Sequence, residues 1–303
     1  MDDSSLRRPL KTLLVGTDFS PGAAQAIERA ATLPLDADAT VHLVHVLPER
    51  IGGVVESPLL DEATKNLDQA AALITELAPG IRVVPALVHG APHAAIVREA
   101  RERNAELVVL GRHGKHSLRE RLLGTTTERV VRHGEVPSLV VSSKRAEPYR
   151  EPMVASDPDD DLRNIEGLVD LASRLSSPDS TRLLLLHVAQ VPFERRLRHT
   201  LGPDEFLAFR EECKAQMLAS ARKVAAHLDA HGLRVRSLVR SGDPRQVIVR
   251  EAKRRYVDLL VLGTHGRTGV AHALLGSVAE WVMRNAPCDV AVQRPRDFHY
   301  EAP

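Results

Sequence analysis

The 303-residue sequence has few aromatic residues, only two cysteines and no long apolar segment. Aromatic residues make up 3% of the chain, which disfavours the base-stacking platforms of single-stranded nucleic-acid binders. Cys213 and Cys288 form no CxxC pair, so we expect neither a disulfide framework nor a zinc ribbon. No stretch approaches the roughly 20 apolar residues that span a bilayer, and the N-terminal residues lack the apolar core of a signal peptide. These absences predict a soluble, cytoplasmic protein without a membrane partner.

Charge of either sign is also not in excess. Lys and Arg total 41 and Asp and Glu total 40, so the formal net charge is +1. Because positive and negative charges are nearly equal in number, we expect no general electrostatic attraction to nucleic acid or to anionic membranes. The hydrophobic fraction of 43% and the charged fraction of 27% are typical of globular proteins, and the length suffices for two domains.

The chain contains an internal repeat. The segment AELVVLGRHGKHSLRERLLGTTTERVV, at 105–131, returns as VDLLVLGTHGRTGVAHALLGSVAEWVM at 257–283, an offset of 152 residues. Such self-similarity indicates a duplicated structural unit. We therefore predict two similar domains, residues 1–146 and 147–303, joined by a stretch that contains Pro148.

Within each half, short apolar runs alternate with stretches of helical spacing. Apolar runs rich in β-branched residues suit strands that are buried on both faces of a parallel sheet. The alternation predicts an α/β fold: two similar open, mostly parallel five-stranded sheets with helices on both faces. The expected strands are 13–16, 41–46, 83–88, 107–110 and 139–141, then 153–155, 183–188, 235–239, 259–262 and 290–292, and the expected helices of the first half are 23–33, 62–77, 94–104 and 126–132.

A longer helix is expected at 203–231 in the second half. Apolar residues recur there at spacings of three and four, which places them on one helix face: Phe206, Phe209, Cys213, Met217, Ala221, Val224 and Leu228. Such a stripe usually packs against a core, so we expect a core-covering helix; a lid or partner surface is the alternative.

A glycine motif appears in both halves after the fourth expected strand. It reads Gly111-x2-Gly114-x9-Gly124-Thr125 and recurs as Gly263-x2-Gly266-x9-Gly276-Ser277. In an open α/β sheet, ligands bind beyond the carboxyl ends of the strands, and the free N–H groups at a helix start bind phosphate. Thr125 and Ser277 could instead be ordinary N-caps and the glycines turn residues. Because the spacing is kept twice, we favour a phosphate site in at least one half; the motif matches neither Walker nor dinucleotide-binding glycine patterns.

Acidic residues follow the first strand of each half. Asp18 ends the first strand and could accept hydrogen bonds from ribose hydroxyls, or Asp18 or Ser20 could cap the next helix. Asp157 is its counterpart, but three further acids follow at 159–161. Several carboxylates would repel a triphosphate unless a cation intervenes. We therefore expect the first half to bind nucleotide better than the second.

The strand order, the aspartate after the first strand and the duplicated G-x2-G-x9-G-[S/T] motif resemble the universal stress protein family in its tandem form. That resemblance covers nearly the whole chain and implies an adenine-nucleotide α-hydrolase-like, Rossmann-like fold. It implies ATP, or AMP or ADP, as the cofactor, with Mg²⁺ as an optional companion ion. The residues that match the family's nucleotide site are Asp18, Val46, Gly111, Gly114, Gly124, Thr125 and Thr126, and, in the second half, Asp157, Val188, Gly263, Gly266, Gly276, Ser277 and Val278.

Basic and histidine residues stand beside the second glycine of each motif. Lys115 and Arg267 follow it and could offset phosphate charge, or be solvated loop residues. His113 and His116 could suggest a metal pair, but no cysteine or carboxylate cluster completes a site and the repeat has Thr268 for His116. We therefore assign no metal ligand, and no catalytic residue either.

Three functions remain open from the sequence. The first is a regulatory protein that binds ATP and changes its contacts with unidentified protein partners under stress. The second is a slow ATPase or autokinase, for which His113 is the only candidate base near the γ-phosphate. The third is a nucleotide-free interaction or chaperone-like module. The duplication also predicts an internal pseudo-twofold pairing of the halves, in a monomer or in a homodimer.

Overall fold

A computed structural model describes residues 8–49, 56–114, 123–144, 146–178, 183–189, 197, 199–264 and 275–295. The first half contains, in chain order, β1 (Leu10–Thr17), α1 (Pro21–Ala31), β2 (Leu35–Leu47), α2 (Glu56–Leu77), β3 (Arg82–His89), α3 (Pro92–Glu102), β4 (Leu107–Gly111), α4 (Thr125–His133) and β5 (Ser138–Val141). The second half contains β6 (Pro152–Ala155), α5 (Leu162–Leu175), β7 (Leu183–Ala189), α7 (Pro203–Ala230), β8 (Val235–Ser241), α8 (Pro244–Arg254), β9 (Leu259–Gly263), α9 (Ser277–Asn285) and β10 (Asp289–Gln293). Every expected strand and every expected helix is therefore present.

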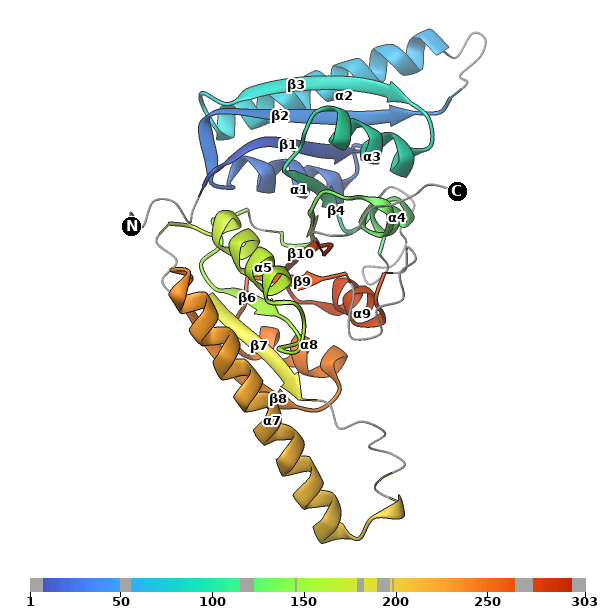
Figure 1. Cartoon of the computed structure of the whole chain (residues 1–303). Coiled ribbons are helices and arrows are strands. Elements are labelled where there is room, and N and C mark those ends of the chain that lie inside the picture. Colours follow the sequence, from blue (N-terminus) through green and yellow to red (C-terminus); the bar gives the residue numbers. More distant parts are fainter. Residues whose placement is uncertain are drawn as a thin grey trace.

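The strands of each half form a five-stranded parallel sheet, as predicted. The two sheets are continuous, in the order β3-β2-β1-β4-β5-β10-β9-β6-β7-β8 (Figure 1). All neighbouring strands within a half run parallel, whereas β5 and β10 pair antiparallel at the junction. The carboxyl ends of the two strand sets therefore lie at opposite edges of the sheet where they meet.

The β5–β10 pair gives the molecule an internal pseudo-twofold axis. Leu139 pairs with Ala291, and these two residues are counterparts in the repeat at its offset of 152 residues. On either side, Val140 pairs with Val290 and Ser138 with Val292, so exchanging the halves maps one pair onto the other. The contact is of the isologous kind expected between like units, and it is made within one chain.

Helices cover both faces of the sheet because side chains alternate along each buried strand. On one face Leu13 and Val15 pack against residues of α1 and α2, and the second half adds α5 and α7. On the other face Leu14 packs with α3 and α4, and the second half adds α8 and α9. Among the residues that the structure describes, none of the helices has both the length and the apolar character that crossing a membrane requires.

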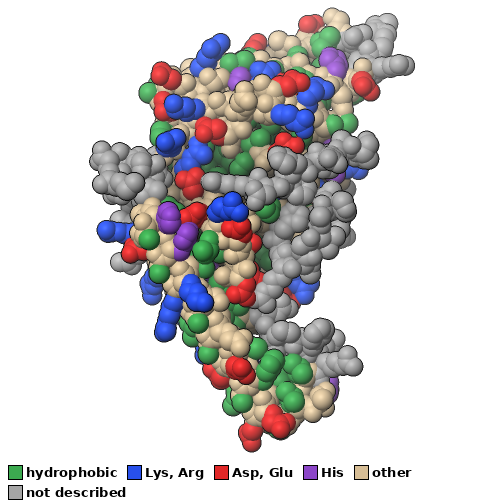
Figure 2. All heavy atoms as spheres, in the orientation of Figure 1, with side chains coloured by type: hydrophobic (Ala, Val, Ile, Leu, Met, Phe, Trp, Pro, Cys, Tyr) green, Lys and Arg blue, Asp and Glu red, His purple; other side chains and the backbone are tan. Residues whose placement is uncertain are grey.

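Helix α7 departs from its expected role along half of its length. It covers the core only through its C-terminal part, where Met217, Ala221, Val224 and Leu228 are buried. Phe206, Phe209 and Cys213 remain partly exposed, and the start of the helix projects beyond the sheet (Figure 1). Figure 2 shows hydrophobic side chains gathered at that projecting tip. The prediction of a core-covering helix was therefore wrong for the N-terminal half of α7, because the sheet edge ends before the helix does.

A buried charged cluster joins the two halves around Asp289 of β10, which is fully buried. Its Oδ2 accepts hydrogen bonds from Arg29 Nε of α1 at 3.0 Å and from the Tyr149 hydroxyl at 2.6 Å. Its Oδ1 accepts the N–H groups of Ser142 and Ser143 at 2.8 and 2.7 Å. One carboxylate therefore ties a helix of the first half and the segment after β5 to a strand of the second half.

Candidate functional site

A cavity of about 450 Å³ lies in the first half, at the carboxyl ends of β1, β2 and β4 and beside the start of α4. Its volume is in the range of small-molecule sites. Seven of the residues predicted for the first half line it: Asp18, Val46, Gly111, Gly114, Gly124, Thr125 and Thr126. Residues that lie more than 100 positions apart in the sequence thus come together around one crevice.

The turn after β1 presents Asp18 to the cavity. Ser20 is the N-cap of α1, where its Oγ accepts the N–H of Ala23. Asp18 instead accepts the N–H of Ser20 through Oδ1 at 3.0 Å. Phe19 between them has φ of +59°, an uncommon conformation for a bulky residue. The helix cap is therefore Ser20, and the Asp18 carboxylate lies on the cavity wall.

Two motif glycines lie where a Cβ atom would meet neighbouring atoms, and at Gly111 these atoms belong to the backbone. A Cβ atom on Gly111 would lie 2.5 Å from the backbone carbonyl group of Gly22, a distance that no side chain tolerates. A Cβ atom on Gly114 would lie 2.5 Å from Oδ2 of Asp18. Gly111 therefore lets α1 approach the end of β4, and Gly114 lets the loop backbone lie directly beside the Asp18 carboxylate.

The start of α4 faces the same cavity without a side-chain cap. Gly124 is the N-cap residue, with φ of −63° and ψ of 139°, and has no side chain to accept helix N–H groups. Thr125 is the first helical residue, so it is not an N-cap. The first N–H groups of a helix have no acceptor within the helix, and they carry its positive end. The backbone at Thr125 and Thr126 therefore offers donors to an anion.

The backbone of Arg112 fixes this helix start, and its side chain reaches the other half. The Arg112 carbonyl accepts the N–H of Gly124 at 2.8 Å. The guanidinium is buried and donates to the carbonyls of Ala286 and Cys288 in the second half at 3.0 and 3.3 Å. Burial lowers the pKa of Arg112, although the nearby Asp289 carboxylate acts in the opposite direction.

Sequence reasoning missed part of the cavity wall. His45 lies on the wall next to Val46 and donates from Nδ1 to the carbonyl of Thr17 at 2.8 Å. Its ring lies 4.4 Å from that of Phe19, so β2 and the turn after β1 hold each other in place. Pro92 and Ile96 of α3 add an apolar side. His45 precedes the predicted Val46 at the end of β2, so its position at the strand end was the available signal.

His113 also lines the cavity. Its Nδ1 is buried and has no hydrogen-bond partner among the described residues. The carbonyl of His113 accepts the Ser20 hydroxyl at 3.4 Å.

The second half repeats several of these features. Asp157 follows β6 and accepts the N–H of Asp159 through Oδ1, as Asp18 does for Ser20. Gly276 is the uncapped N-cap of α9, Ser277 is its first residue and Val278 follows. Val188 lies in β7 and Gly263 ends β9. Lys115, Gly266 and Arg267 lie outside the described residues.

The acids after β6 are engaged locally. Asp161 is the N-cap of α5, where Oδ1 accepts the N–H of Arg163 at 2.8 Å. Asp160 accepts the N–H of Asp161. These exposed acids form the turn that starts α5, where the first half has the single cap Ser20. The local electrostatics of the two strand ends therefore differ.

His187 of β7 is the counterpart of His45 but is fully buried. Its Nδ1 lies 3.1 Å from the carbonyl of Ser156, while Nε2 is buried without a partner in the described part of the chain. Burial lowers the pKa of His187 below its ordinary 6.5, although the Ser156 carbonyl and the carboxylates of Asp157 and Asp159 oppose this. His187 is therefore a neutral core residue near pH 7.

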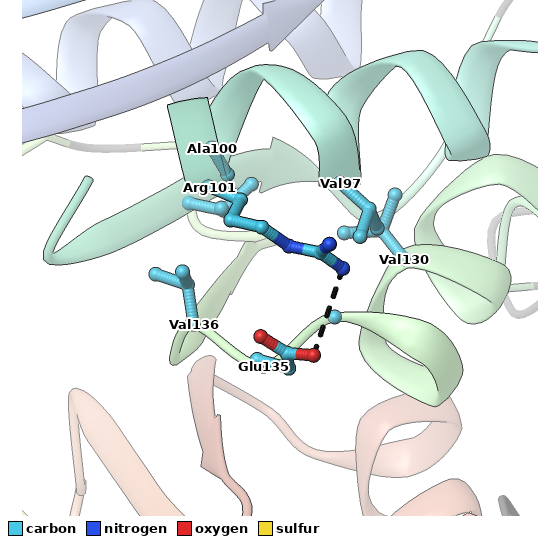
Figure 3. A pocket seen from close by; sticks show the side chains of 8 residues that line it. Val97, Ala100, Arg101, Val130, Glu135 and Val136 are labelled. Atoms are coloured by element: carbon cyan, nitrogen blue, oxygen red, sulfur yellow. Dashed lines mark ion pairs between the residues drawn. The ribbon is translucent and has the colours of Figure 1, made fainter. Parts of the chain in front are cut away.

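A second hollow lies between α3 and α4, lined by apolar residues and the Arg101–Glu135 pair (Figure 3). Its volume is about 40 Å³, little more than the space of one water molecule. The ion pair across it spans 3.6 Å between largely exposed side chains. It is a surface packing gap and is too small for a nucleotide.

Comparison with known proteins agrees with the repeat and the fold. A model of the universal stress protein family matches the chain twice, over residues 9–142 and 153–294. A universal stress protein of Mycolicibacterium smegmatis is 26% identical over 307 residues, which cover 94% of this chain and 97% of that protein. The shorter universal stress protein MJ0577 of Methanocaldococcus jannaschii is 28% identical over 159 residues, covering 45% of this chain and 97% of its own length. The crystal structure of a universal stress protein from Archaeoglobus fulgidus shares the fold, with a TM-score of 0.71 at 18% identity over 94% of this chain and 98% of its own. The chain therefore belongs to the universal stress protein family and carries the family's domain twice in tandem.

Proposed function

We propose that this protein is a cytoplasmic regulatory protein that binds ATP, or a related adenine nucleotide, in its first half. One observation carries the proposal: the uncapped start of α4, Asp18 and the motif glycines surround a single cavity of about 450 Å³. The cavity lies beyond the carboxyl ends of parallel strands, where α/β folds bind their ligands. The family resemblance and the cavity thus point to the same ligand class.

Each part of the cavity suits one part of a nucleotide. The N–H groups at Thr125 and Thr126 would receive phosphate oxygens, because a helix start combines free donors with a positive dipole end. The Asp18 carboxylate would accept hydrogen bonds from ribose hydroxyls. Val46, Ile96 and Leu110 supply apolar surface for the base. Lys115 stays a proposed phosphate partner.

We expect the protein to bind the nucleotide without hydrolysing it. Hydrolysis or autophosphorylation requires a group that positions the nucleophile and commonly Mg²⁺. For His113, the candidate named above, the described residues supply no hydrogen-bond partner to Nδ1. We therefore expect phosphate release by the purified protein to stay at the level of a no-protein control.

We propose that the second half binds nucleotide less well than the first, and its motif residues Gly266, Gly276 and Ser277 stay candidates. The acids that start α5 carry several negative charges beside the strand end where a phosphate would approach. Repulsion between like charges raises the cost of binding an anion there.

We also propose that the two domains comprise residues 1–146 and 147–303.

The decisive experiment is Gly124→Asp, with Gly276→Asp as the matched variant in the second half. The backbone angles at Gly124 suit any residue. A Cβ atom there would lie 3.3 Å from the Arg112 carbonyl oxygen, which must give by a few tenths of an ångström, and in ordinary contact with Gly114 N and Thr127 Oγ1 at 3.7 and 3.8 Å. Aspartate is a strong N-cap, so its carboxylate would accept the helix N–H groups and put negative charge where phosphate would bind. Losing two charge-assisted hydrogen bonds costs about 3 kcal/mol or more, so we expect ATP affinity to fall at least about 100-fold.

Nucleotide binding is measured by titration calorimetry with ATP, and by mass spectrometry of small molecules released from protein purified without added nucleotide. Gly124→Asp should weaken binding by the factor given above and retain the thermal unfolding midpoint, because a capped helix is at least as stable. Gly276→Asp should bind like the wild type. If the wild type binds no adenine nucleotide at millimolar concentration, the proposal is wrong and an interaction or chaperone-like module is the better account.

A further inference from the structure

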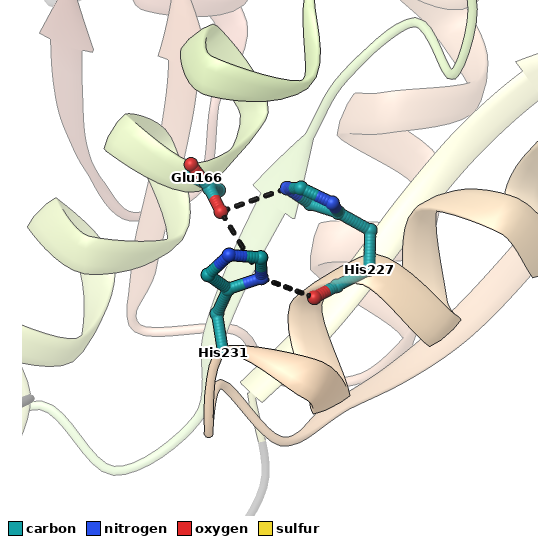
Figure 4. Close-up of side chains that lie close together, drawn as sticks. All are labelled: Glu166, His227 and His231. Atoms are coloured by element: carbon teal, nitrogen blue, oxygen red, sulfur yellow. Dashed lines mark hydrogen bonds and ion pairs between the residues drawn. The ribbon is translucent and has the colours of Figure 1, made fainter.

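A cluster of two histidines and one glutamate lies between α5 and α7 (Figure 4), and none of the three lines the cavity of the first half. His227 is in the last turn of α7 and His231 is its C-cap residue. The spacing of four places both imidazoles on one face of the helix. Glu166 of α5 points at both rings: its Oε1 lies 2.8 Å from His227 Nε2 and 3.6 Å from His231 Nδ1.

The three side chains lie close enough to share one metal ion, although His231 faces Glu166 with Nδ1 and its ring would have to turn to present Nε2. Zinc binds imidazole nitrogen and carboxylate oxygen at about 2.0–2.2 Å in tetrahedral geometry, which sets neighbouring ligand atoms about 3.4 Å apart. One ligand atom from each of the three residues lies within 4.8 Å of the others. Side-chain rotations would therefore seat an ion. The side chains of Glu166 and His227 are 25% and 29% exposed and that of His231 is 55% exposed, which leaves access from solvent and room for a water as fourth ligand.

The surrounding fold prepares the cluster for a cation. Nδ1 of His231 donates to the carbonyl of His227 at 2.8 Å, which fixes the tautomer and leaves the Nε2 lone pair available. The C-terminus of α7 is the negative end of its dipole and favours positive charge. Leu228 on α7 and Ile165 on α5 are fully buried beside the ligands, so two anchored helices carry the donors.

A hydrogen bond between Glu166 and His227 accounts for the position of the His227 ring but not for that of His231. The ring of His231 lies 4.4 Å from that of His227 and turns toward the same carboxylate. The first half has no such pair, since Thr75 and Pro79 stand 152 residues before the two histidines. We propose that Glu166, His227 and His231 form a binding site for a zinc-type divalent cation, specific to the second half, that links α5 to the end of α7.

The test is direct Zn²⁺ binding by the tag-free, metal-free full chain, measured without nucleotide by competition with a chromogenic chelator. Cys213→Ser serves as the background, because this removes the partly exposed thiol as a competing ligand. We expect one Zn²⁺ per chain. Each of Glu166→Gln, His227→Gln and His231→Gln should weaken binding at least about 100-fold, since even partners outside the ligand set are worth 10- to 100-fold. Co²⁺ should give the absorption of a tetrahedral site in the wild type alone.

His199→Gln is the matched control, since His199 is an exposed histidine outside the cluster, and it should bind Zn²⁺ like the wild type. The metal-free variants should unfold at the wild-type temperature, and only the proteins with all three ligands should gain thermal stability with Zn²⁺, which EDTA reverses. Equal zinc affinity in the wild type and in a His227→Gln/His231→Gln double variant would overturn the proposal, as would a substoichiometric zinc content that the ligand variants share.

Discussion

At the residue scale, the most informative positions are those where a counterpart in the other half sits in a different environment. Asp18 lies on the wall of the cavity beside Gly114, whereas Asp157 belongs to a turn with further acids. His45 lies on the cavity wall, whereas His187 is fully buried. The same residue type at the same strand end therefore has different chemistry in the two halves.

The burial of His187 predicts part of the acid sensitivity of the fold. Its folded-state pKa is lowered by burial, so the unfolded chain binds a proton more readily than the native protein does. The stability that neutral His187 contributes is therefore present above about pH 6.5 and is lost as the pH falls below that value. His187→Asn, which can still donate to the Ser156 carbonyl, should reduce the pH dependence of the unfolding free energy by up to about 1.4 kcal/mol per pH unit.

Urea unfolding between pH 5 and 7.5 measures this dependence. His199→Asn is the control, because it replaces an exposed histidine, and its curve should follow that of the wild type. A His187→Asn protein with the wild-type pH dependence would show that His187 titrates normally in the fold.

The cavity residues were largely predictable because the glycine spacing occurs twice after a fourth strand. The sequence could not decide whether Thr125 is the N-cap of a helix or a phosphate-binding residue, since both kinds of residue stand at the start of a helix. The structure settles the cap: Gly124 holds that position. The cluster at Glu166 could not be predicted, because a spacing of four between two histidines is common and its carboxylate comes from another helix about 60 residues earlier.

At the element scale, α7 combines two different environments in one helix. Its C-terminal half covers β7 and β8, whereas its N-terminal half extends past the sheet. Apolar residues recur with helical spacing along the whole stripe, so periodicity alone could not show where the contact with the sheet ends. Glu205 accepts the N–H of the N-cap residue Gly202 through Oε2 at 3.1 Å, which stabilises the helix start locally, in the part of α7 that has no buried residue.

The two halves of α7 should respond differently to the same substitution. Leu228 is fully buried, whereas Leu207 is 49% exposed. Leu228→Ala should lower the unfolding free energy by about 2–5 kcal/mol through lost burial and a cavity, and Leu207→Ala should change it by less than about 0.5 kcal/mol. Denaturant unfolding of both variants makes the comparison within one helix and one residue type.

Hydrogen exchange provides an independent measurement on the wild type. Amides near Phe206 should exchange faster than amides near Val224, because few buried contacts hold the start of the helix. Equal protection along α7, or a large cost for Leu207→Ala, would mean that the projecting part is covered by a second copy or another partner in solution.

At the scale of the whole molecule, the continuous ten-stranded sheet was the feature least accessible to sequence reasoning. The number of strands in each half and their parallel direction followed from the alternation of apolar runs and helices, whereas the order of the strands across the sheet was not predicted. The pairing of β5 with β10 did not, because Ser138–Val141 and Asp289–Gln293 are short apolar runs whose partners depend on how the halves dock. The Arg29–Asp289 pair, which spans 260 positions, is equally invisible to local patterns.

Asp289 should therefore control the stability of the joined halves. Asp289→Asn would leave the buried Arg29 guanidinium without its counter-charge, and we expect a loss of about 3–5 kcal/mol. Asp258→Asn is the matched control: its carboxylate also accepts two backbone N–H groups near the junction, from Arg150 and Glu151, but lies in exposed surroundings. It should cost about 1 kcal/mol or less.

Calorimetric unfolding of both variants distinguishes the outcomes. The wild type should unfold in one transition, and Asp289→Asn should separate it into two or lower its midpoint far more than Asp258→Asn does. Equal midpoints for the two variants would show that the buried pair does not hold the halves together.

The pseudo-twofold axis through Leu139 and Ala291 has a consequence for how the two halves can diverge. In a dimer of identical chains, every residue at such an interface occurs twice, so a buried charge on one side brings a second one on the other. This constraint does not apply within a single chain. Asp289 pairs with Arg29 only once, because the residue that corresponds to Asp289 in the first half is Pro137. Fusion thus allows broken symmetry at the junction, so that one half can keep an open crevice while the other acquires histidines of its own.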